Sequence, residues 1–230
     1  MNKTALQAVE DRLMRSLIPF LLLGLAAAPA LAKRTPADSG PGPSKTPTVL
    51  VLGDSLSAGY GLKRAEAYPA LLSAKAAALG QPLRILNAGV SGDTTAGALR
   101  RLPGLLDRRI DVLLVELGIN DIFRGVPVSQ IEANLQKIID LARAHSPRVR
   151  VIVAGMQLPQ TSVDDSLTAF GQMYAELARR NSAELVPFLL AGVAGNPNLN
   201  LPDMIHPNAS GQKILAANVW PVLERVLRRS

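Results

Sequence analysis

Short apolar runs alternate along this chain with longer segments in which apolar residues recur at helical spacing. Five runs have the length and composition of strands, and they span residues 48–53, 83–89, 111–118, 149–155 and 183–188. These runs contain little polar alternation, which is typical of strands that are buried on both faces. We therefore expect a parallel sheet that is covered by helices on its two sides.

Helical periodicity fills the intervals between the runs. It predicts helices over residues 65–79, 94–108, 128–144 and 165–181, and a last helix over about 208–228. Pro103 should kink or interrupt the second helix, because proline lacks an N–H donor and clashes with the preceding turn. The pattern predicts one α/β domain over residues 48–230, a three-layer α/β/α sandwich with a five-stranded parallel sheet (flavodoxin-like).

The segment before this predicted domain has a different composition. Arg15 precedes an apolar run that ends in the small-residue pattern ALA at residues 30–32. We interpret residues 1–32 as a secretory signal peptide that is cleaved after Ala32, with a retained membrane anchor as the alternative. Residues 33–47 are rich in Pro, Gly and Ser, so a disordered linker is expected there. The mature protein would then be periplasmic or secreted, without an integral membrane segment.

Composition and charge narrow the function classes. The chain has no Cys, which excludes disulfides, thiol catalysis and thiolate metal sites, and its two His residues exclude a His-rich metal centre. Aromatic residues make up only 3%, too few for a platform that stacks single-stranded nucleic acid. The net charge of +7 is spread along the chain, so we expect no nucleic-acid partner. We also expect the protein to be a monomer. An anion-binding surface protein is the alternative that the charge suggests.

Polar residues follow the predicted strands at the sheet edge where open α/β folds hold ligands. They are Asp54 and Ser55 after the first run, residues 91–94 after the second, Asn120 and Asp121 after the third, and Asp203 and His206 near the C-terminus. A phosphate-binding loop does not fit, since Ala58 stands at the second glycine of a Walker motif. The dinucleotide motif fails too, because Arg64 stands at its third glycine.

A serine hydroxyl becomes a nucleophile when a neighbouring base takes its proton. Ser55 is the candidate nucleophile and His206 the candidate base, because His145 lies at a predicted helix C-terminus and is expected to be a surface cap. Asp203 precedes His206 by three residues, which lets its carboxylate reach Nδ1 and leaves Nε2 free to face Ser55. An Asp-x-x-His pair alone is more often structural, so the other segments must support this interpretation.

Acyl transfer also requires donors for the developing oxyanion. The candidates are the backbone N–H groups of Ser55 and Gly92 and the side-chain amide of Asn120. The alternative for Gly92 and Asn120 is that they only shape turns. We interpret the neighbouring acids as structural groups that anchor turns through hydrogen bonds; these are Asp54, Asp93 and Asp121.

Four blocks in register, GDSLSAGYG, NAGVSGDTTAGALRRLPGLL, VLLVELGIND and DMIHPN, resemble the SGNH or GDSL hydrolase family over residues 48–225. They are most similar to its bacterial periplasmic arylesterase, thioesterase I and lysophospholipase L1 branch. The resemblance implies a serine esterase that hydrolyses acyl esters, and acyl thioesters as well, through an acyl-enzyme without a metal or organic cofactor. It assigns the nucleophile to Ser55, the acid and base to Asp203 and His206, and the oxyanion hole to Ser55, Gly92 and Asn120.

The chain departs from the pattern of this branch at three places. Ile119 stands where the branch often has glycine, and we expect its bulk to narrow the acyl site. Residues 160–162, Gln-Thr-Ser, replace an Asn-Tyr-Gly loop, and Met204 replaces a small residue between the acid and the base. These departures leave specificity open. A carbohydrate O-acetylesterase or acyltransferase and an inactive acyl- or glycan-binding protein therefore remain alternatives.

Overall fold

The computed structural model describes residues 46–158 and 165–229, and the fold is that of the compact unit Pro43–Ser230. The predicted signal peptide, most of the predicted linker and residues 160–162 lie outside the described residues. None of the helices within the described ranges is long and apolar enough to cross a membrane.

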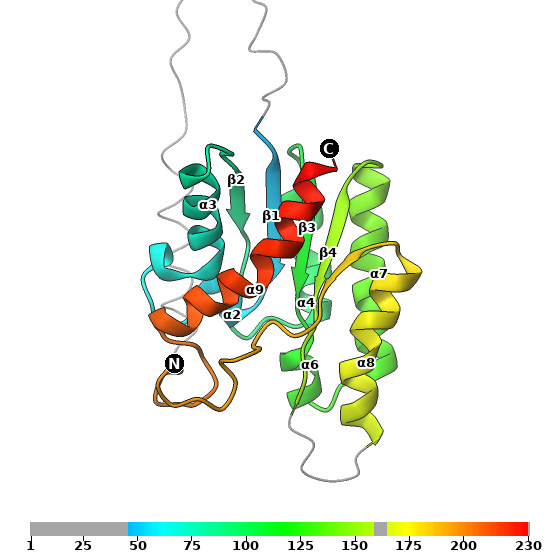
Figure 1. Ribbon diagram of the computed structural model, residues 1–230. Helices are drawn as coiled ribbons and strands as arrows, with labels where there is room; N and C mark the ends of the chain where they lie inside the picture. Colours follow the sequence, from blue (N-terminus) through cyan, green and yellow to red (C-terminus); the bar gives the residue numbers. More distant parts are fainter. Residues whose placement is uncertain (1–45, 159–164, 230) are drawn as a thin grey trace, which may run out of the picture. The chain divides into compact units, whose positions relative to one another are not determined.

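A five-stranded parallel sheet forms the centre of the domain (Figure 1). Its strands are β1 (Thr48–Gly53), β2 (Arg84–Asn87), β3 (Val112–Glu116), β4 (Arg150–Ala154) and β5 (Glu184–Val186). Their order is β2-β1-β3-β4-β5, and each lies within one of the predicted apolar runs. The register pairs Gly53 with Glu116, so the carboxyl ends of β1 and β3 lie side by side.

Burial of the strands depends on their place in the sheet. All residues of β1 and β3 are buried, as the lack of polar alternation predicted. The edge strands β2 and β5 differ, because none of the four residues of β2 and only one of the three residues of β5 is fully buried. The prediction of two buried faces is therefore wrong at the edges, where one side of each strand has no neighbour.

Six helices lie, to within a residue, in the segments where the periodicity predicted helix. They are α3 (Tyr68–Ala78), α4 (Thr95–Arg101), α5 (Pro103–Leu106), α7 (Val128–His145), α8 (Asp165–Arg180) and α9 (Ala209–Arg228). Pro103 interrupts the second predicted helix as expected, since α4 ends before it and α5 begins with it. The short helices α2 (Ser55–Ala58), η1 (Arg64–Glu66) and α6 (Ile119–Phe123) were not predicted.

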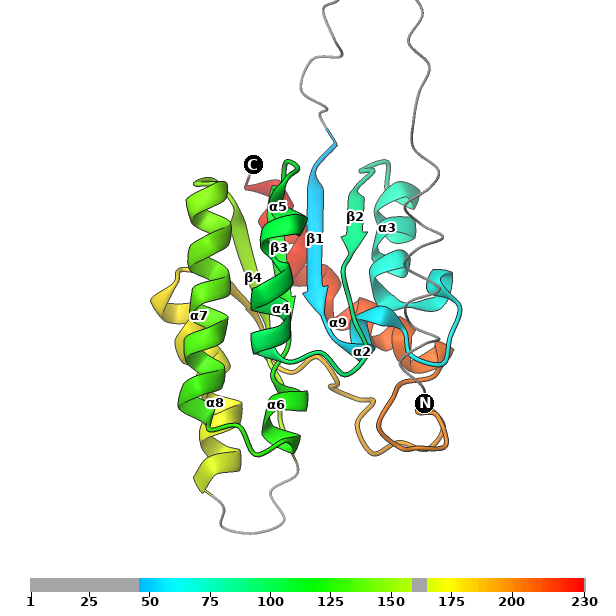
Figure 2. The ribbon, with the colours of Figure 1, turned by 180° about the vertical axis from the view of Figure 1, so that it is seen from behind.

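The helices form two layers around the sheet, which confirms the α/β/α sandwich. Helices α3 and α9 pack together on one face (Figure 1). Helices α4, α5 and α7 cover the other face, as the view from behind shows, and α8 packs beside α7 (Figure 2). The core between the layers is built mainly from aliphatic side chains of the strands and of the inner helix faces.

The carboxyl ends of the strands hold the polar groups that the sequence singled out. Helix α2 begins directly after β1, and α6 follows β3 after a two-residue turn. The segment from β5 to α9, drawn in gold and orange, returns across this end of the sheet toward α2 (Figure 1). Its hydrogen bonds include an antiparallel bridge between Asn200 and Pro207, and Asn208 caps the first turn of α9.

Candidate active site

Ser55 lies at the first position of α2, where the chain turns from a buried strand into a helix. Its side chain is nearly buried, with 8% of the residue exposed. Asp54 caps this helix, since its Oδ1 accepts a hydrogen bond from the Leu56 N–H at 3.0 Å. Backbone N–H groups in the first turn of a helix have no intrahelical acceptor, so the Ser55 N–H is available to a ligand. The turn therefore presents a hydroxyl and a backbone donor together.

His206 and Asp203 complete a chain of hydrogen bonds with Ser55. His206 Nε2 lies 3.0 Å from Ser55 Oγ, and His206 Nδ1 lies 2.7 Å from Asp203 Oδ2. The other oxygen, Asp203 Oδ1, accepts the N–H groups of His206 at 3.0 Å and Ile205 at 2.9 Å. These backbone bonds, His206 first, lower the pKa of Asp203 to about 2, so its carboxylate stays charged at any pH near neutrality.

The segment that carries His206 and Asp203 is held by its own backbone. The Leu201 N–H donates to the His206 carbonyl at 2.7 Å, and the Met204 N–H donates to the Leu201 carbonyl at 2.9 Å. Met204 itself adopts a left-handed conformation, with φ at 60°. The ring of Tyr60 packs against the imidazole of His206, with the two centroids 4.3 Å apart. These contacts orient the imidazole toward Ser55.

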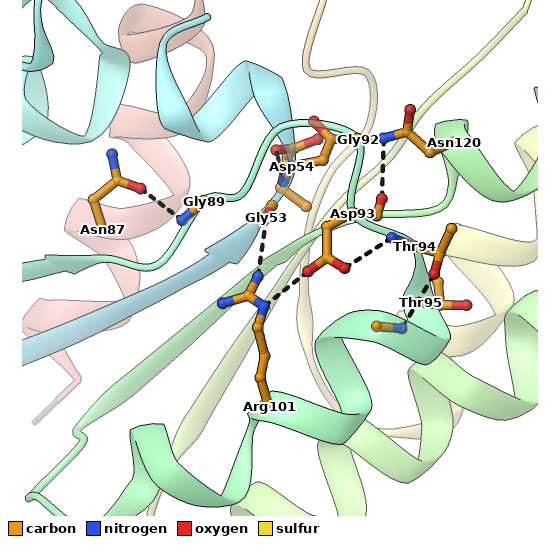
Figure 3. Close-up of polar contacts among 12 residues, drawn as sticks. Gly53, Asp54, Asn87, Gly89, Gly92, Asp93, Thr94, Thr95, Arg101 and Asn120 are labelled. Atoms are coloured by element: carbon orange, nitrogen blue, oxygen red, sulfur yellow. Dashed lines mark hydrogen bonds and ion pairs between the residues drawn. The ribbon is translucent and has the colours of Figure 1, made fainter. Parts of the chain in front are cut away.

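Gly92 and Asn120 lie together at the ends of β2 and β3 (Figure 3). Gly92 has a φ of 76°, a conformation that L-residues other than glycine adopt only with strain. The amide nitrogen of Asn120 donates to Asp54 Oδ2 and to the Asp93 carbonyl, each at 3.0 Å. Both of its hydrogens are thus engaged within the protein, so a ligand that accepted from this amide would have to replace one of these two acceptors.

The acids beside these groups have the structural contacts that the sequence predicted. Asp93 accepts from the Thr94 N–H at 3.0 Å and pairs with Arg101 at 2.8 Å, and Arg101 also reaches the Gly53 carbonyl (Figure 3). Asp121 instead accepts from both the backbone N–H and the hydroxyl of Thr95, at 2.9 and 2.6 Å. These acids fix the Gly92 loop and the start of α4.

Three further residues at the site escaped the sequence prediction. Tyr60 lies between two glycines of the GDSLSAGYG block and was given no role in the sequence analysis. Arg124, which no motif marks, donates to the Gly92 carbonyl at 2.9 Å. Glu116 is fully buried at the end of β3, where its Oε2 accepts from the Asp54 N–H at 3.2 Å. An acid inside an otherwise apolar run was the one signal available for Glu116.

Exposed apolar side chains surround the site. Five large apolar residues with 44–61% of their surface exposed belong to loops at this edge of the sheet or flank it; they are Tyr60, Val90, Phe123, Met204 and Ile205. Ile119, which we expected to narrow the acyl site, packs partly against the core. The rim around the polar groups is therefore suited to an apolar ligand.

Comparison with known proteins assigns the chain to a family. A family model described as the GDSL-like Lipase/Acylhydrolase family matches residues 51–214. The esterase TesA of Pseudomonas aeruginosa is 40% identical over 181 residues, which cover 78% of this chain and 89% of TesA. The thioesterase 1/protease 1/lysophospholipase L1 of Escherichia coli is 36% identical over 170 residues, which cover 74% of this chain and 79% of that protein.

Solved structures agree with these relatives. The crystal structure of TesA matches with a TM-score of 0.74 at 39% identity, covering 78% of this chain and 99% of that chain. The fold and the polar edge thus define a hydrolase with a three-layer α/β/α fold that acts on ester bonds. This chain belongs to the GDSL-like lipase/acylhydrolase family, and it is an ester-bond hydrolase of the branch that contains the esterase, arylesterase and thioesterase relatives.

Proposed function

We propose that this ester hydrolase works through an acyl-enzyme on Ser55, with His206 as general base and Asp203 as the group that orients it. The observation that carries the proposal is the continuous chain from Asp203 Oδ2 through both imidazole nitrogens to Ser55 Oγ, with links of 2.7 and 3.0 Å. Such a chain fixes the tautomer with the proton on Nδ1, so Nε2 is the atom that accepts the serine proton.

The proton and the acyl group move in two stages. As Ser55 Oγ attacks the carbonyl carbon, its proton passes to His206 Nε2, and the carbonyl oxygen becomes an oxyanion. The Ser55 N–H, the Gly92 N–H and the Asn120 amide donate to that oxyanion. His206 then gives its proton to the departing alcohol or thiol, and a water molecule activated by the same nitrogen releases the acid.

The substrate class that fits this site is an acyl ester with an apolar acyl or aryl group. The exposed apolar rim supports this choice, because it offers area for a hydrocarbon next to the reacting hydroxyl. A thioester is an alternative substrate of the same mechanism, since only the leaving group differs. The names of the relatives, arylesterase and thioesterase 1/lysophospholipase L1, match both classes.

We also propose that the protein is exported and acts in the periplasm or outside the cell. The support is the pattern of residues 15–32, with a basic residue, an apolar run and a small-residue cleavage motif. N-terminal sequencing of the protein from an expressing cell should begin at Lys33. A band that retains residues 1–32 in the membrane fraction would contradict cleavage.

The test of the activity is a substrate series run beside Ser55→Ala. We expect the wild-type protein to hydrolyse aryl esters of increasing acyl length and acyl thioesters, and Ser55→Ala to lose roughly 10⁵-fold or more in kcat. Preference for an acetylated sugar would favour a carbohydrate O-acetylesterase, and transfer to an added alcohol would favour an acyltransferase. Hydrolysis that persists in Ser55→Ala would refute the proposed nucleophile.

A further inference from the structure

Behind Ser55 lie two buried acids that the proposed mechanism does not use as reacting groups. Asp54 and Glu116 are both completely buried, at the adjoining carboxyl ends of β1 and β3. Burial raises the pKa of Glu116 well above its usual value, and the negative charge of Asp54 raises it further. Burial also raises the pKa of Asp54, to about 6. Two carboxylates this close in a low-dielectric interior cannot both ionise readily near neutral pH.

The hydrogen bonds decide which acid keeps the proton. Both oxygens of Asp54 accept: Oδ1 from the Leu56 N–H and Oδ2 from the Asn120 amide, each at 3.0 Å. Two donors stabilise Asp54 as the anion. Glu116 differs, because its Oε2 accepts from Ser57 Oγ at 2.7 Å and from the Asp54 N–H, while its Oε1 is buried with no hydrogen-bond partner in the described part of the chain.

An unpartnered oxygen of an ionised, buried carboxylate is costly, whereas a neutral acid carries its proton on that oxygen at much lower cost. The hydroxyl network around Glu116 agrees with this assignment. Tyr68 Oη lies 2.8 Å from Ser57 Oγ, and since the Ser57 proton points at Glu116 Oε2, the tyrosine supplies the proton of that bond. The Ser57 hydroxyl and the Asp54 N–H therefore both donate to Oε2. Oε1 is the oxygen that is left to carry the proton of Glu116.

We propose that Glu116 is a positioning residue of this active site: it stays neutral, leaves Asp54 as the anion, and through Asp54 orients the Asn120 amide and the turn that carries Ser55. The proposal rests on the mechanism proposed above. A carboxylate accepts but cannot donate, so an anionic Asp54 requires the nitrogen side of Asn120 to face it. The second hydrogen of that amide then donates to the Asp93 carbonyl, next to Gly92, and this is the hydrogen that the proposed oxyanion would accept.

Glu116 also supports the nucleophile through the backbone. Its Oε2 holds the Asp54 N–H and the Ser57 hydroxyl, the residues on either side of the Ser55–Leu56 pair. Glycine at position 53 leaves the space for this contact, because a Cβ there would lie 2.6 Å from Glu116 Oε2. One neutral acid thus fixes two of the three proposed oxyanion donors, although it touches neither Ser55 Oγ nor the substrate side of Asn120.

The charged and titratable groups that face this pair are few. Asp54 faces His206 and Asp93 besides Glu116, and Tyr68 of α3 and Tyr174 of α8 are the other titratable groups near Glu116 in the described part of the chain. Burial raises the pKa of both tyrosines well above the usual value, so they stay neutral hydrogen-bonding groups throughout the working pH range. The proton balance is therefore decided between the two acids.

The test compares two substitutions of Glu116. Glu116→Gln keeps a neutral side chain with a donor and an acceptor, whereas Glu116→Leu removes both in a similar volume. We expect Glu116→Leu to lower kcat for a short aryl ester about 10- to 100-fold with KM changed by less than about twofold, because misaligned oxyanion donors act on the transition state. Glu116→Gln should restore kcat to within about threefold of the wild type. Equal loss in both variants, or no loss in Glu116→Leu, would overturn the proposal.

A second measurement tests the protonation state of Glu116 even if Glu116→Leu does not fold. The infrared difference spectrum of wild type minus Glu116→Gln at pH 7 should contain the C=O band of a protonated carboxylic acid. The matched control Glu176→Gln should lack that band, because Glu176 is exposed and the ion pair with Arg179 lowers its pKa. A wild-type spectrum with carboxylate bands only would refute a neutral Glu116. Ser55→Ala tests the mechanism separately, so failure of either idea can be recognised.

Discussion

The two halves of the proposed active site are held in opposite ways. The sheet half comprises Ser55 and Asn120, and it is anchored to buried acids, Asp54 and Glu116, within the core. The loop half comprises Asp203 and His206 and lies near solvent. It is held by backbone bonds within residues 201–206 and by two backbone N–H groups that donate to the Asp203 carboxylate.

The difference separates catalysis from stability. The side chain of Asp203 is 36% exposed, so its charge is already solvated, and we expect the fold to tolerate its replacement by Asn. Asp54 and Glu116 are desolvated and belong both to the core and to the site. Substitutions of Asp203 and His206 should therefore lower kcat with little change in the free energy of unfolding. Substitutions of Asp54 and Glu116 should lower both.

Asp203→Asn is expected to have the largest effect in this comparison, after loss of the nucleophile itself. An amide cannot hold the imidazole in the tautomer that accepts the serine proton, so kcat should fall about 10³- to 10⁴-fold. The melting temperature should change little, because the residue is exposed. Thermal unfolding and aryl-ester kinetics measure both. Asp107→Asn, an exposed acid away from the catalytic groups, is the matched control, and a large drop in melting temperature for Asp203→Asn would contradict the division.

Asn120→Ala should lower kcat roughly 100- to 1,000-fold, the usual cost of losing one oxyanion donor. The domain should still fold, although Asp54 Oδ2 loses its partner and stability falls by about 1–3 kcal/mol. Urea unfolding and steady-state kinetics distinguish the two effects. Unchanged turnover would remove Asn120 from the mechanism and leave it as a residue that shapes a turn.

The pH dependence follows from the shifted acids. The pKa of Asp54 is raised to about 6, so this group is ionised above that pH and takes up a proton as the pH falls through it. Protonated Asp54 no longer fixes the Asn120 amide, and kcat/KM should fall on the acid side. Asp203 does not contribute, because its pKa of about 2 keeps it charged throughout.

The pH–rate profile of Asn120→Ala isolates this effect. That variant has no amide at position 120 for Asp54 to orient. The fall of kcat/KM at low pH should therefore be shallower than in the wild type and should depend on protonation of the general base alone. Superimposable acid limbs for the two proteins would contradict a role of Asp54 in orienting Asn120.

The smallest expected effect concerns the ring that covers the base. Tyr60 packs on His206 with its aromatic face, so Tyr60→Phe should retain wild-type kcat/KM and Tyr60→Ala should lose about 2- to 10-fold. Kinetics with one aryl ester are sufficient. If Tyr60→Phe were as impaired as Tyr60→Ala, the hydroxyl and not the ring would be the important group.

Much of the architecture could be predicted because it depends on local patterns. The apolar runs located all five strands, and right-handed crossovers explained why Ser55, Asn120 and Gly92 share one edge. Asp203 and His206 could be paired because they are three residues apart. The exposure of β2 and β5 could not be predicted, because the strand order that leaves them at the edges is a property of the whole sheet.

Contacts between residues far apart in the sequence could not be predicted either. Nothing near Glu116 in the sequence indicates that it faces Asp54, 62 residues away. Tyr60 likewise meets His206 only through folding of the segment after β5. A single sequence shows that an acid interrupts an apolar strand, but the register of β1 on β3 decides which group the acid meets.

The most direct test of the account is to locate the covalent adduct. The protein should be treated with a fluorophosphonate ester, digested, and analysed by mass spectrometry, with His206→Ala and Ser55→Ala in parallel. The account predicts one phosphonylated side chain, Ser55, labelled far more slowly in His206→Ala and not at all in Ser55→Ala. An adduct on another residue, or labelling of Ser55 at an equal rate without His206, would contradict it.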